Sequence, residues 1–354
     1  MENGSYKFSL IMLQMYQIIE IMYQFNYKYW YNFVLLIRAV KMKAIILKEF
    51  GGVENFQTIE IPVPVIKADE VLIKLKSISI NPVDVKTREG KGMASRIKDP
   101  MPIILGWDIS GVITETGADV TGFKAGDEVF SMIEFPKLGK AYAEYVVAKP
   151  SELAIKPANI SHDEAAAATL AALTAWQALT LHVTIKSGDR VLIQAAAGGV
   201  GHYAVQIAKH MGAYVIGTSS AANKDLILSL GADEHIDYHA QSLEQAAKNI
   251  DYILDPIGGD NTSLLLNIVK KGGTIISIMG GLTEPLLQKA AELGINAHNI
   301  LVYPSGADME TIAGFLTKGI VKSVVYKTFP FDQLADAHLE LAKGRTAGKI
   351  TLAF

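Results

Sequence analysis

From residue 42 to roughly residue 160, the chain shows short runs in which hydrophobic and polar residues alternate. Alternation places every second side chain on one face of an extended segment, so each run predicts a β-strand. The predicted strands are 43–47, 57–61, 71–75, 109–116, 128–132 and 142–147. Turn residues such as Gly51, Pro62 and Gly126 separate them. Short strands with glycine turns and few long helices favour a β-rich, partly closed barrel.

The pattern changes after residue 160. Residues 162–181 are rich in alanine and leucine, which predicts one helix, and strands then alternate with helices. The predicted strands are 190–194, 214–218, 251–254, 274–278 and 298–302, and the predicted helices are 200–211, 223–230, 261–270 and 285–293. This alternation predicts an α/β region with a parallel sheet covered by helices on both faces. Residues 305–354 return to short mixed elements and end in a strand at 349–352.

The first 41 residues differ from the rest. They hold six of the 14 tyrosines, and charges at Lys7, Glu20, Lys28 and Arg38 leave uncharged runs of 12, 7 and 9 residues. A membrane span needs about 20 mostly apolar residues, and a secretory signal needs a basic start and a small-residue cleavage site. Two interpretations stay open: a membrane-associating or partner-binding helix, or upstream sequence, not native or not ordered, before a fold that opens at Met42. We favour the second and expect a cytoplasmic protein.

Composition removes several chemistries. The chain has no cysteine, which excludes disulfides, iron–sulfur clusters, thiolate zinc sites and cysteine nucleophiles. Its 33 lysines and arginines against 36 aspartates and glutamates give a net charge of -3, so we expect no nucleic-acid partner. The length of 354 residues suggests two domains, each with room for a core.

A glycine-rich turn carries the clearest local signal. Strand 190–194 runs into the segment AAAGGVG, and an amphipathic helix follows. In this arrangement the helix N-terminus binds the diphosphate of a dinucleotide, Gly198 lets the backbone approach it, and Gly201 allows the helix to pack on the strand. Alanine stands at the first glycine position of the usual motif, and a purely structural tight turn is the alternative. The predicted cofactor contacts here are Ala196, Gly198, Gly199, Val200 and Gly201.

The next strand ends in a segment rich in hydroxyl groups, Thr218-Ser219-Ser220, with Lys224 just beyond. Sites specific for NAD place an acidic residue there to bind the ribose 2′-hydroxyl. Here the first acid is Asp225, and hydroxyls with a cation favour a 2′-phosphate. The sequence therefore predicts NADPH over NADH, with Thr218, Ser219 and Lys224 as contacts. In the alternative interpretation, a serine caps a helix and Lys224 is solvated.

Motifs spread over most of the chain resemble one family. They are Asn81–Lys86 (NPVDVK), Gly106–Gly111 (GWDISG), Gly126–Val129 (GDEV), Ala143–Tyr145 (AEY), Thr174–Trp176 (TAW), Ala195–Gly201, Leu230–Asp233 (LGAD) and Gly348–Ile350 (GKI). In this order they resemble the medium-chain dehydrogenase/reductase superfamily, in particular its zinc-free quinone oxidoreductase branch. The NPVD form and Tyr303–Gly306 (YPSG) are similar to the alkenal/enone oxidoreductases within that branch.

This resemblance implies the domain organisation. It implies a GroES-like β-rich catalytic domain at 42–164 and 303–354, and a Rossmann domain with a doubly wound parallel sheet at 165–302, after the extension at 1–41. The substrate would lie in the cleft between the two domains, at the carboxyl ends of the strands. A homodimer is also implied by the resemblance alone.

The departures from the zinc-containing branch bear on the chemistry. Zinc alcohol dehydrogenases have a cysteine ligand where Asn81 stands and a His-Glu pair where Trp107-Asp108 stands. Among the eight histidines, His235 and His239 come nearest to a ligand spacing, flanking a predicted strand end. We therefore expect no catalytic zinc, and without a Lewis acid simple alcohol oxidation is not favoured.

NADPH can still reduce an acceptor that is already electrophilic, such as a quinone or an α,β-unsaturated carbonyl. The protein must then position the acceptor and donate a hydrogen bond to its developing oxyanion. Asn81 is the candidate donor, Asp84 a candidate to order Asn81, Lys86 or a water, and Tyr142 a candidate proton donor. The alternatives are a turn at Asn81, a capping acid at Asp84 and a buried strand tyrosine at Tyr142, with the proton coming from solvent.

The resemblance implies further cofactor contacts. Thr174 would lie under the nicotinamide and Tyr238 beside the 2′-phosphate. The strand ends at Asp255 and Gly280 would border the nicotinamide ribose, and the segment from Leu301 to Tyr303 would line the carboxamide end. Lys349 is expected to reach the cofactor. Thr174 bonded to its own helix and Lys349 in solvent are the alternatives.

Together these residues predict an NADPH-dependent reductase of small quinones or enones that needs neither zinc, nucleic acid nor a membrane. A non-catalytic NADPH-binding sensor or interaction protein on the same fold is the alternative, because a fold does not determine a function.

Overall fold

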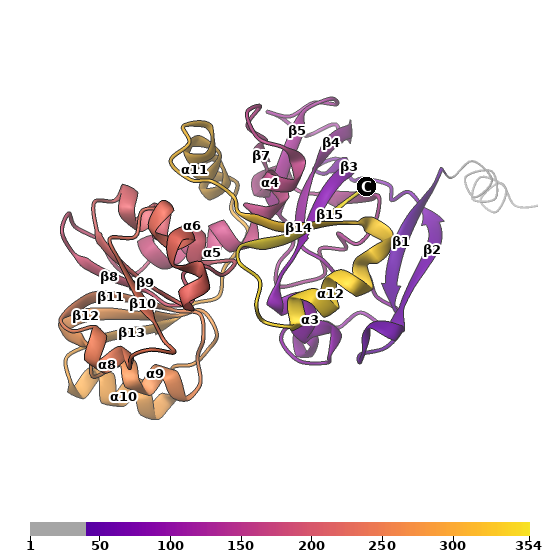
Figure 1. Ribbon diagram of the computed structural model, residues 1–354. Coiled ribbons are helices and arrows are strands. Elements are labelled where there is room, and N and C mark those ends of the chain that lie inside the picture. Colours follow the sequence, from indigo (N-terminus) through magenta and orange to yellow (C-terminus); the bar gives the residue numbers. More distant parts are fainter. Residues whose placement is uncertain (1–39) are drawn as a thin grey trace, which may run out of the picture. The chain divides into compact units, whose positions relative to one another are not determined.

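The computed structural model describes residues 40–354 (Figure 1). The expectations for the N-terminal extension fall on residues 1–41 and so lie almost entirely outside the described residues. The protein divides into two compact units, of which the larger comprises residues 43–59 and 64–354. The described residues of the smaller unit are 40–42 and 60–63. No helix within residues 40–354 is both long and apolar enough to cross a membrane.

The strands that follow the alternating runs form a seven-stranded sheet. Its order is β14-β15-β3-β4-β5-β7, and β6 also pairs with β3. The bounds are β3 (Val71–Ile80), β4 (Asp108–Thr116), β5 (Glu128–Met132), β6 (Tyr145–Ala148), β7 (Ala154–Ile155), β14 (Val325–Pro330) and β15 (Lys349–Ala353). A separate pair is formed by β1 (Lys41–Leu47) and β2 (Phe56–Pro62). Because β15 runs antiparallel to β3, the start of the C-terminal strand lies beside the end of β3, with Ile350 opposite Ile80.

A six-stranded parallel sheet occupies the middle of the chain, in the order β10-β9-β8-β11-β12-β13. The bounds are β8 (Arg190–Ile193), β9 (Tyr214–Ser219), β10 (Glu234–Asp237), β11 (Ile250–Asp255), β12 (Val269–Ser277) and β13 (Asn296–Asn299). The chain order reverses between β8 and β11, which is the point where open parallel sheets bind ligands at the carboxyl ends of their strands. The predicted α/β class, with a GroES-like part and a Rossmann part, is thereby confirmed, whereas the residue boundaries between the two domains stay a prediction.

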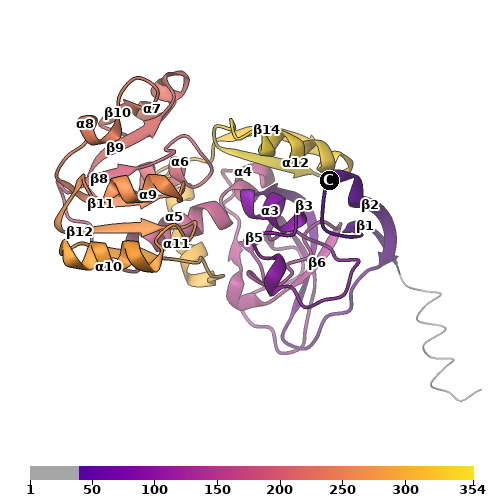
Figure 2. The ribbon, with the colours of Figure 1, turned by 90° about the horizontal axis from the view of Figure 1, so that it is seen from below.

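Helices pack against both the parallel sheet and the seven-stranded sheet. The α-helices are α3 (Pro82–Arg88), α4 (His162–Ala167), α5 (Leu170–Thr180), α6 (Gly201–His210), α7 (Lys224–Ser229), α8 (Leu243–Ala246), α9 (Asp260–Leu265), α10 (Glu284–Glu292), α11 (Gly306–Thr317) and α12 (Leu334–Ala342). In the parallel sheet, α5 and α6 cover one face, and α9 and α10 cover the other (Figures 1 and 2). Successive strand residues such as Leu192 and Ile193 alternate between the two cores, as a sheet buried on both faces requires.

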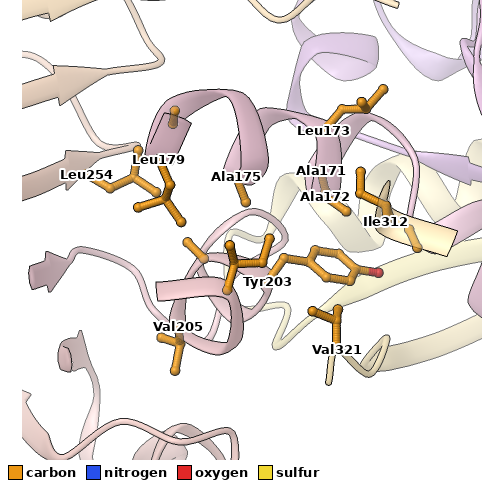
Figure 3. Packing of buried hydrophobic residues seen from close by; sticks show 14 of the residues in the cluster. Ala171, Ala172, Leu173, Ala175, Leu179, Tyr203, Val205, Leu254, Ile312 and Val321 are labelled. Carbon is orange, nitrogen blue, oxygen red and sulfur yellow. The ribbon is translucent and has the colours of Figure 1, made fainter. Parts of the chain in front are cut away.

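The core beneath α5 shows why this part of the chain is rich in alanine. Tyr203 of α6 is fully buried and lies among Ala171, Ala172 and Val321 (Figure 3). Small side chains on α5 leave the space that this large ring fills, and its hydroxyl donates to Ser323 at 2.8 Å. Dense packing of this kind holds α6, and therefore the turn in front of it, in a defined position.

Residues 162–181 form two helices and not the single predicted one. Between α4 and α5, Thr169 adopts φ -107° and ψ -102°, outside the helical region. The Leu170 N–H then donates to the Asp108 carboxylate at 3.0 Å, and the Thr169 hydroxyl donates to the Ala166 carbonyl at 2.9 Å. A distant carboxylate has replaced a local hydrogen bond, which helix propensity cannot anticipate.

Other predicted elements also differ from the structure. The strand expected at 142–147 begins only at Tyr145, and the helix expected at 261–270 ends at Leu265. The strand expected near 298–302 is β13, which ends at Asn299. The C-terminal region holds two regular helices, α11 and α12, where only short mixed elements were expected.

Candidate active site

A cleft of about 870 Å³ lies within the larger unit, at the carboxyl ends of the central parallel strands. Side chains and backbone from both sheets line it: the glycine-rich turn, the segments after β11, β12 and β13, the start of α3 and the start of β15. Its charged lining side chains are Lys86, Arg96 and Lys349, all cationic. Of the predicted site residues, those lining the cleft are Asn81, Thr174, Gly198, Gly199, Val200, Gly201, Gly280, Leu301 and Lys349.

The glycine-rich turn is made almost entirely of backbone. Ala195 adopts φ 44°, and the Gly198 N–H closes the turn on the Ala195 carbonyl at 2.8 Å. A Cβ at Gly201 would overlap that same carbonyl oxygen, so only glycine allows α6 to start this close to the strand. Ala196 is fully buried below the turn and donates its N–H to the Thr218 carbonyl at 2.8 Å. The turn therefore presents an unobstructed helix N-terminus to the cleft, which suits an anion.

The residues predicted for the 2′-phosphate lie beyond the lining of the cleft. The Thr218 hydroxyl accepts the Ala195 N–H at 3.2 Å, which ties the end of β9 to the turn. The Ser219 hydroxyl donates to the Ser220 carbonyl at 2.9 Å and lies 3.0 Å from Nε2 of His235. Lys224, at the start of α7, is exposed, and the side chain of Tyr238 is 58% exposed.

Asp255 and Tyr303 do not reach the cleft in the predicted way. The buried Asp255 carboxylate accepts the Ile257 and Gly258 N–H groups and the Thr262 hydroxyl, so it closes the turn after β11. The backbone of Tyr303 is bound through both its N–H and its carbonyl by a glutamine on α5, and Tyr303 is not among the lining residues. These two residues support neighbouring segments that do line the cleft.

The hydroxyl of Thr174 is already occupied. It donates to the Leu170 carbonyl one turn earlier in α5, at 2.7 Å, which is the backbone contact that the alternative interpretation expected. The residue still lines the cleft, so it offers its methyl group and the lone pairs of its hydroxyl oxygen to a ligand.

A buried polar cluster of Asn81, Asp108 and Lys349 lies where α3 and β15 begin. We call this part of the cleft the reaction end, because it is where the predicted acceptor would bind. The Asn81 amide donates from Nδ2 to the Oδ2 of Asp108 at 2.8 Å, and its Oδ1 accepts from the ammonium of Lys349. Lys349 also lies 3.4 Å from the same carboxylate oxygen. The exposed fractions are 3% for Asn81, 0% for Asp108 and 3% for Lys349. Burial lowers the pKa of Lys349, and the neighbouring carboxylates of Asp108 and Asp84 oppose that shift.

The prediction that Lys349 reaches the cofactor needs correction for its ammonium group. The stem of the side chain lies against the glycine-rich turn, where a Cβ at Gly199 would approach Cδ of Lys349 to 3.3 Å. The ammonium itself turns away from the turn and donates to the Ile80 carbonyl at 3.1 Å as well as to Asn81 and Asp108. With three acceptors around three hydrogens, it has no donor left for a cofactor phosphate.

A second buried chain of titratable groups lies behind Asn81. Asp84 accepts the Asn81 backbone N–H at 2.8 Å, and its other oxygen accepts the Tyr142 hydroxyl at 2.8 Å. The Tyr142 oxygen in turn lies 2.9 Å from Nε2 of His338. Burial, with a smaller effect of Asp108, raises the pKa of Asp84 to about 7. Burial lowers the pKa of His338 to about 3, so its imidazole is neutral and donates to Tyr142 through Nε2.

This chain of hydrogen bonds shows where two predicted catalytic residues are directed. Asp84 orders Asn81 through the backbone at the first turn of α3 and does not line the cleft, as the capping interpretation expected. Tyr142 is fully buried, and its hydroxyl is directed to Asp84 and His338 instead of the cleft. Burial and the Asp84 carboxylate also hold the pKa of Tyr142 well above its usual value, which makes it a poor acid.

Comparison with known proteins agrees with this geometry. A family model described as "Alcohol dehydrogenase GroES-like domain" matches residues 67–158, and one described as "Zinc-binding dehydrogenase" matches residues 230–352. The mitochondrial NAD(P)H oxidoreductase RTN4IP1 of Mus musculus is 33% identical, covering 88% of this chain and 89% of that protein. The chloroplastic NADPH-dependent alkenal/one oxidoreductase of Arabidopsis thaliana is also 33% identical, covering 88% of this chain and 79% of that protein.

A solved structure extends the comparison to three dimensions. The quinone oxidoreductase from Coxiella burnetii has a TM-score of 0.85 at 33% identity, covering 89% of this chain and all of that one. The chain belongs to the medium-chain dehydrogenase/reductase superfamily. Within that superfamily it is an oxidoreductase of the branch that contains the quinone and alkenal/one reductases.

Within this superfamily, the reaction end of the chain does not fit a catalytic zinc ion. The Asn81 amide is bound by Lys349 and Asp108, and an ammonium cannot ligate a metal. Among residues 40–354, no three side chains of His, Cys, Asp or Glu gather closely enough to hold a metal ion. The matched model is named for zinc-binding dehydrogenases, but the donor set of this member is an amide, one carboxylate and a lysine.

Two residues that contact predicted site residues were not among the sequence-based candidates: Asp108, which binds the Asn81 amide, and His338, which contacts Tyr142. Asp108 was noted only as a departure from a zinc ligand pair, although it stands in a motif that the superfamily shares, and that position was the available signal. His338 lies on α12, where an isolated histidine in a helix carries no signal at all. Only the folded chain places His338 beside Tyr142, 196 residues away in sequence.

Proposed function

We propose that this protein is an NADPH-dependent, zinc-independent reductase that transfers a hydride to a quinone or an α,β-unsaturated carbonyl. The observation that carries the proposal is the cleft itself, which joins an open helix N-terminus at the glycine-rich turn to a buried amide donor at Asn81. The helix N-terminus suits a diphosphate, and the amide donor suits a developing oxyanion.

NADPH supplies the hydride when it is bound, and the residues of the chain position the acceptor. The hydride adds to the electrophilic carbon of an enone, the electrons of the double bond move to the carbonyl oxygen, and solvent supplies the proton. In a quinone the same hydride, together with one proton from solvent, gives the hydroquinone. Asn81 donates a hydrogen bond to the oxygen that becomes negative, which stabilises the transition state more than the ground state.

The preference for NADPH rests on the end of β9. Ser219, Ser220 and the exposed Lys224 offer hydroxyls and a cation, and the first acid, Asp225, follows Lys224. The relative from Arabidopsis thaliana is named as NADPH-dependent, which supports the same choice. One charge-assisted hydrogen bond contributes about 1.5–3 kcal/mol, so we expect kcat/KM to favour NADPH by at least about tenfold.

Independence from zinc rests on the donor set at Asn81. A metal would have to displace the Lys349 ammonium from its three acceptors, which are the Ile80 carbonyl, the Asn81 amide oxygen and the Asp108 carboxylate. We expect a chelator to leave turnover unchanged, and elemental analysis of the purified protein to find less than stoichiometric zinc.

The proposal is tested by following the oxidation of NADPH and of NADH with a quinone, an enone or an aldehyde as the acceptor. A separate assay follows the reduction of the oxidised cofactor by a primary alcohol. Turnover of the quinone or the enone with NADPH supports the proposal, and turnover of the alcohol contradicts it. Tight NADPH binding without any turnover supports the alternative, a non-catalytic NADPH-binding sensor or interaction protein.

We also propose a homodimer. The strand β13 is the last in the six-stranded sheet, so its outer backbone edge has no strand partner among the described residues. Light scattering coupled to gel filtration measures the mass directly, and a monomer would contradict this part of the proposal. The cytoplasmic location stays a prediction.

A further inference from the structure

The side-chain amide of Asn81 has two chemically different ends, and each meets a partner of defined polarity. Lys349 donates to Oδ1, and Nδ2 donates to the Oδ2 of Asp108 at 2.8 Å. An ammonium has no acceptor and an ionised carboxylate has no donor. The reversed amide would therefore place donor against donor and acceptor against acceptor, and only one orientation is compatible with both partners.

We propose that Lys349 and Asp108 are positioning residues that hold the Asn81 amide in this orientation, so that its second Nδ2 hydrogen serves the acceptor oxygen. The proposal rests on the proposed function, because it assigns the source of that function's hydrogen-bond donor. Of the two hydrogens on Nδ2, one is bound by Asp108, which is its only partner among residues 40–354. Since Asn81 lines the cleft, the other hydrogen is the donor that remains for a ligand.

The two positioning residues are themselves held in place. The Lys349 ammonium uses its remaining hydrogens on the Ile80 carbonyl, at 3.1 Å, and on Asp108, at 3.4 Å. The second oxygen of Asp108 accepts the Leu170 N–H at 3.0 Å, which is available because α5 starts there. Each partner of the amide therefore has its own fixed contacts, which is the support that a preorganised donor needs.

The charge on Lys349 makes this orientation depend on pH. The titratable groups that face the ammonium are Asp108, Asp84 and His202. Burial lowers the pKa of Lys349 below its usual value, although both carboxylates oppose the shift, and the pKa of His202 is lowered to about 4 by burial, so His202 is neutral. A neutral amine can accept a hydrogen bond as well as donate one, so deprotonation removes the restriction on Oδ1. Turnover should accordingly fall as the pH rises through the lowered lysine pKa.

A double-mutant cycle tests the proposal. Lys349→Met keeps the length of the stem and removes the donor, and Asn81→Ala removes the amide. Each single variant should lower kcat by about 10²–10³-fold, the usual effect of losing one oxyanion donor. In the Asn81→Ala background, Lys349→Met should cost no more than about threefold, because the lysine acts through an amide that is gone. Two losses that multiply fully would overturn the proposal.

Lys156 provides a matched control. It is a second buried lysine, 7% exposed, that donates to the Ile160 and Pro157 carbonyls and pairs with Glu128 at 3.1 Å, away from the lining of the cleft. Lys156→Met makes the same chemical change and should lower the stability while kcat stays within about threefold. A Lys349→Met variant that behaves like Lys156→Met would show that Lys349 is only structural and would overturn the proposal.

The binding of two probes separates this proposal from the proposed function. The affinity for NADPH should stay within about threefold in Lys349→Met, because the ammonium does not face the cofactor; a loss confined to NADPH affinity would overturn the proposal.

4-Nitrophenolate mimics an enolate oxygen and binds without turnover, so the same cycle can be measured by its absorbance shift. If the wild type reduces no acceptor yet the phenolate cycle is non-additive, the proposed function fails and the positioning role stands. Conservative Lys349→Arg should restore part of the phenolate affinity and move the alkaline limb of the pH profile upward.

Discussion

The two ends of the cleft are formed by different parts of the residues, backbone at one end and side chains at the other. The cofactor end consists of backbone: seven consecutive residues, Ala195–Gly201, form a turn in which a Cβ at Gly201 would overlap the chain. The reaction end consists of side chains from three distant segments, and Lys349 lies 268 residues beyond Asn81 in the sequence. A backbone site depends on local conformation, whereas a side-chain cluster depends on every element that brings its members together.

The difference extends to electrostatics. At the glycine-rich turn, partial charges of the α6 N-terminus attract an anion without a titratable side chain. At the reaction end, the Lys349 ammonium lies 3.4 Å from the buried Asp108 carboxylate, and burial raises the pKa of Asp84 and lowers the pKa of Lys349. We therefore expect the cofactor end to be insensitive to pH near neutrality and the reaction end to be sensitive to it.

The variant Asn81→Ala tests whether the two ends of the cleft act independently. Asn81→Ala should lower kcat by about 10²–10³-fold, because it removes a donor to the developing oxyanion. The affinity for NADPH, measured by fluorescence titration, should change by less than about threefold, since the amide belongs to the other end. Equal losses in kcat and in cofactor affinity would mean that the two ends are not separate.

A substitution in the glycine-rich turn should instead affect the binding of NADPH. Gly201→Ala places a Cβ on the Ala195 carbonyl oxygen, so the turn must shift and the NADPH affinity should fall by about 100-fold, or about 2.7 kcal/mol. Gly314→Ala in α11 is the matched control, because nothing lies within 4 Å of a Cβ there. That control should bind NADPH normally and gain up to about 1 kcal/mol of stability. Normal NADPH affinity in Gly201→Ala would contradict the prediction that the diphosphate binds at this turn.

The pH dependence of stability tests the buried carboxyl behind Asn81. The folded pKa of Asp84, about 7, lies above the usual unfolded value, so the folded state binds an extra proton in mildly acidic solution. This contribution is lost as the pH rises through 7, and from pH 5.5 to 8 the free energy of unfolding should fall by about 2 kcal/mol. Urea unfolding of Asp84→Asn should lack this component, and an unchanged pH dependence in that variant would contradict the assignment.

A charge reversal at Lys224 tests whether this lysine binds the 2′-phosphate at the cofactor end. Lys224→Glu should lower the affinity for NADPH by about tenfold through repulsion of the 2′-phosphate, and it should leave NADH within about threefold. Lys248→Glu reverses a charge at another exposed lysine of the same domain and serves as the control. Equal effects of the two substitutions on NADPH would indicate a general field and no specific contact.

Most of the fold could be predicted because local patterns and global packing agree. The strand–helix repeats of the parallel sheet follow directly from which side chains must be buried. The failures lie where a tertiary contact competes with a local preference. The break at Thr169 depends on the Asp108 carboxylate, and α12 follows a strand that pairs only with the far C-terminus.

The candidate site divides in the same way. The glycine positions of the turn are predictable because a missing Cβ has a local steric reason that can be read along the chain. The role of Lys349 was not predictable in detail, since a lysine at the start of a strand can face solvent or a buried carboxylate with equal local justification. Tyr142 and Asp255 were assigned to the reaction and to the cofactor, but their hydrogen bonds go to other parts of the protein.

The order of residues along the chain was enough for the architecture, the family and the glycine-rich turn, because each depends on short-range sterics or on a periodic burial pattern. The direction of the Asn81 amide, the burial of Asp84 and the partnership of Lys349 with Asp108 required the folded protein. Hydrogen-bond polarity and desolvation act over a few ångströms in space, and residues at that separation here come from opposite ends of the chain.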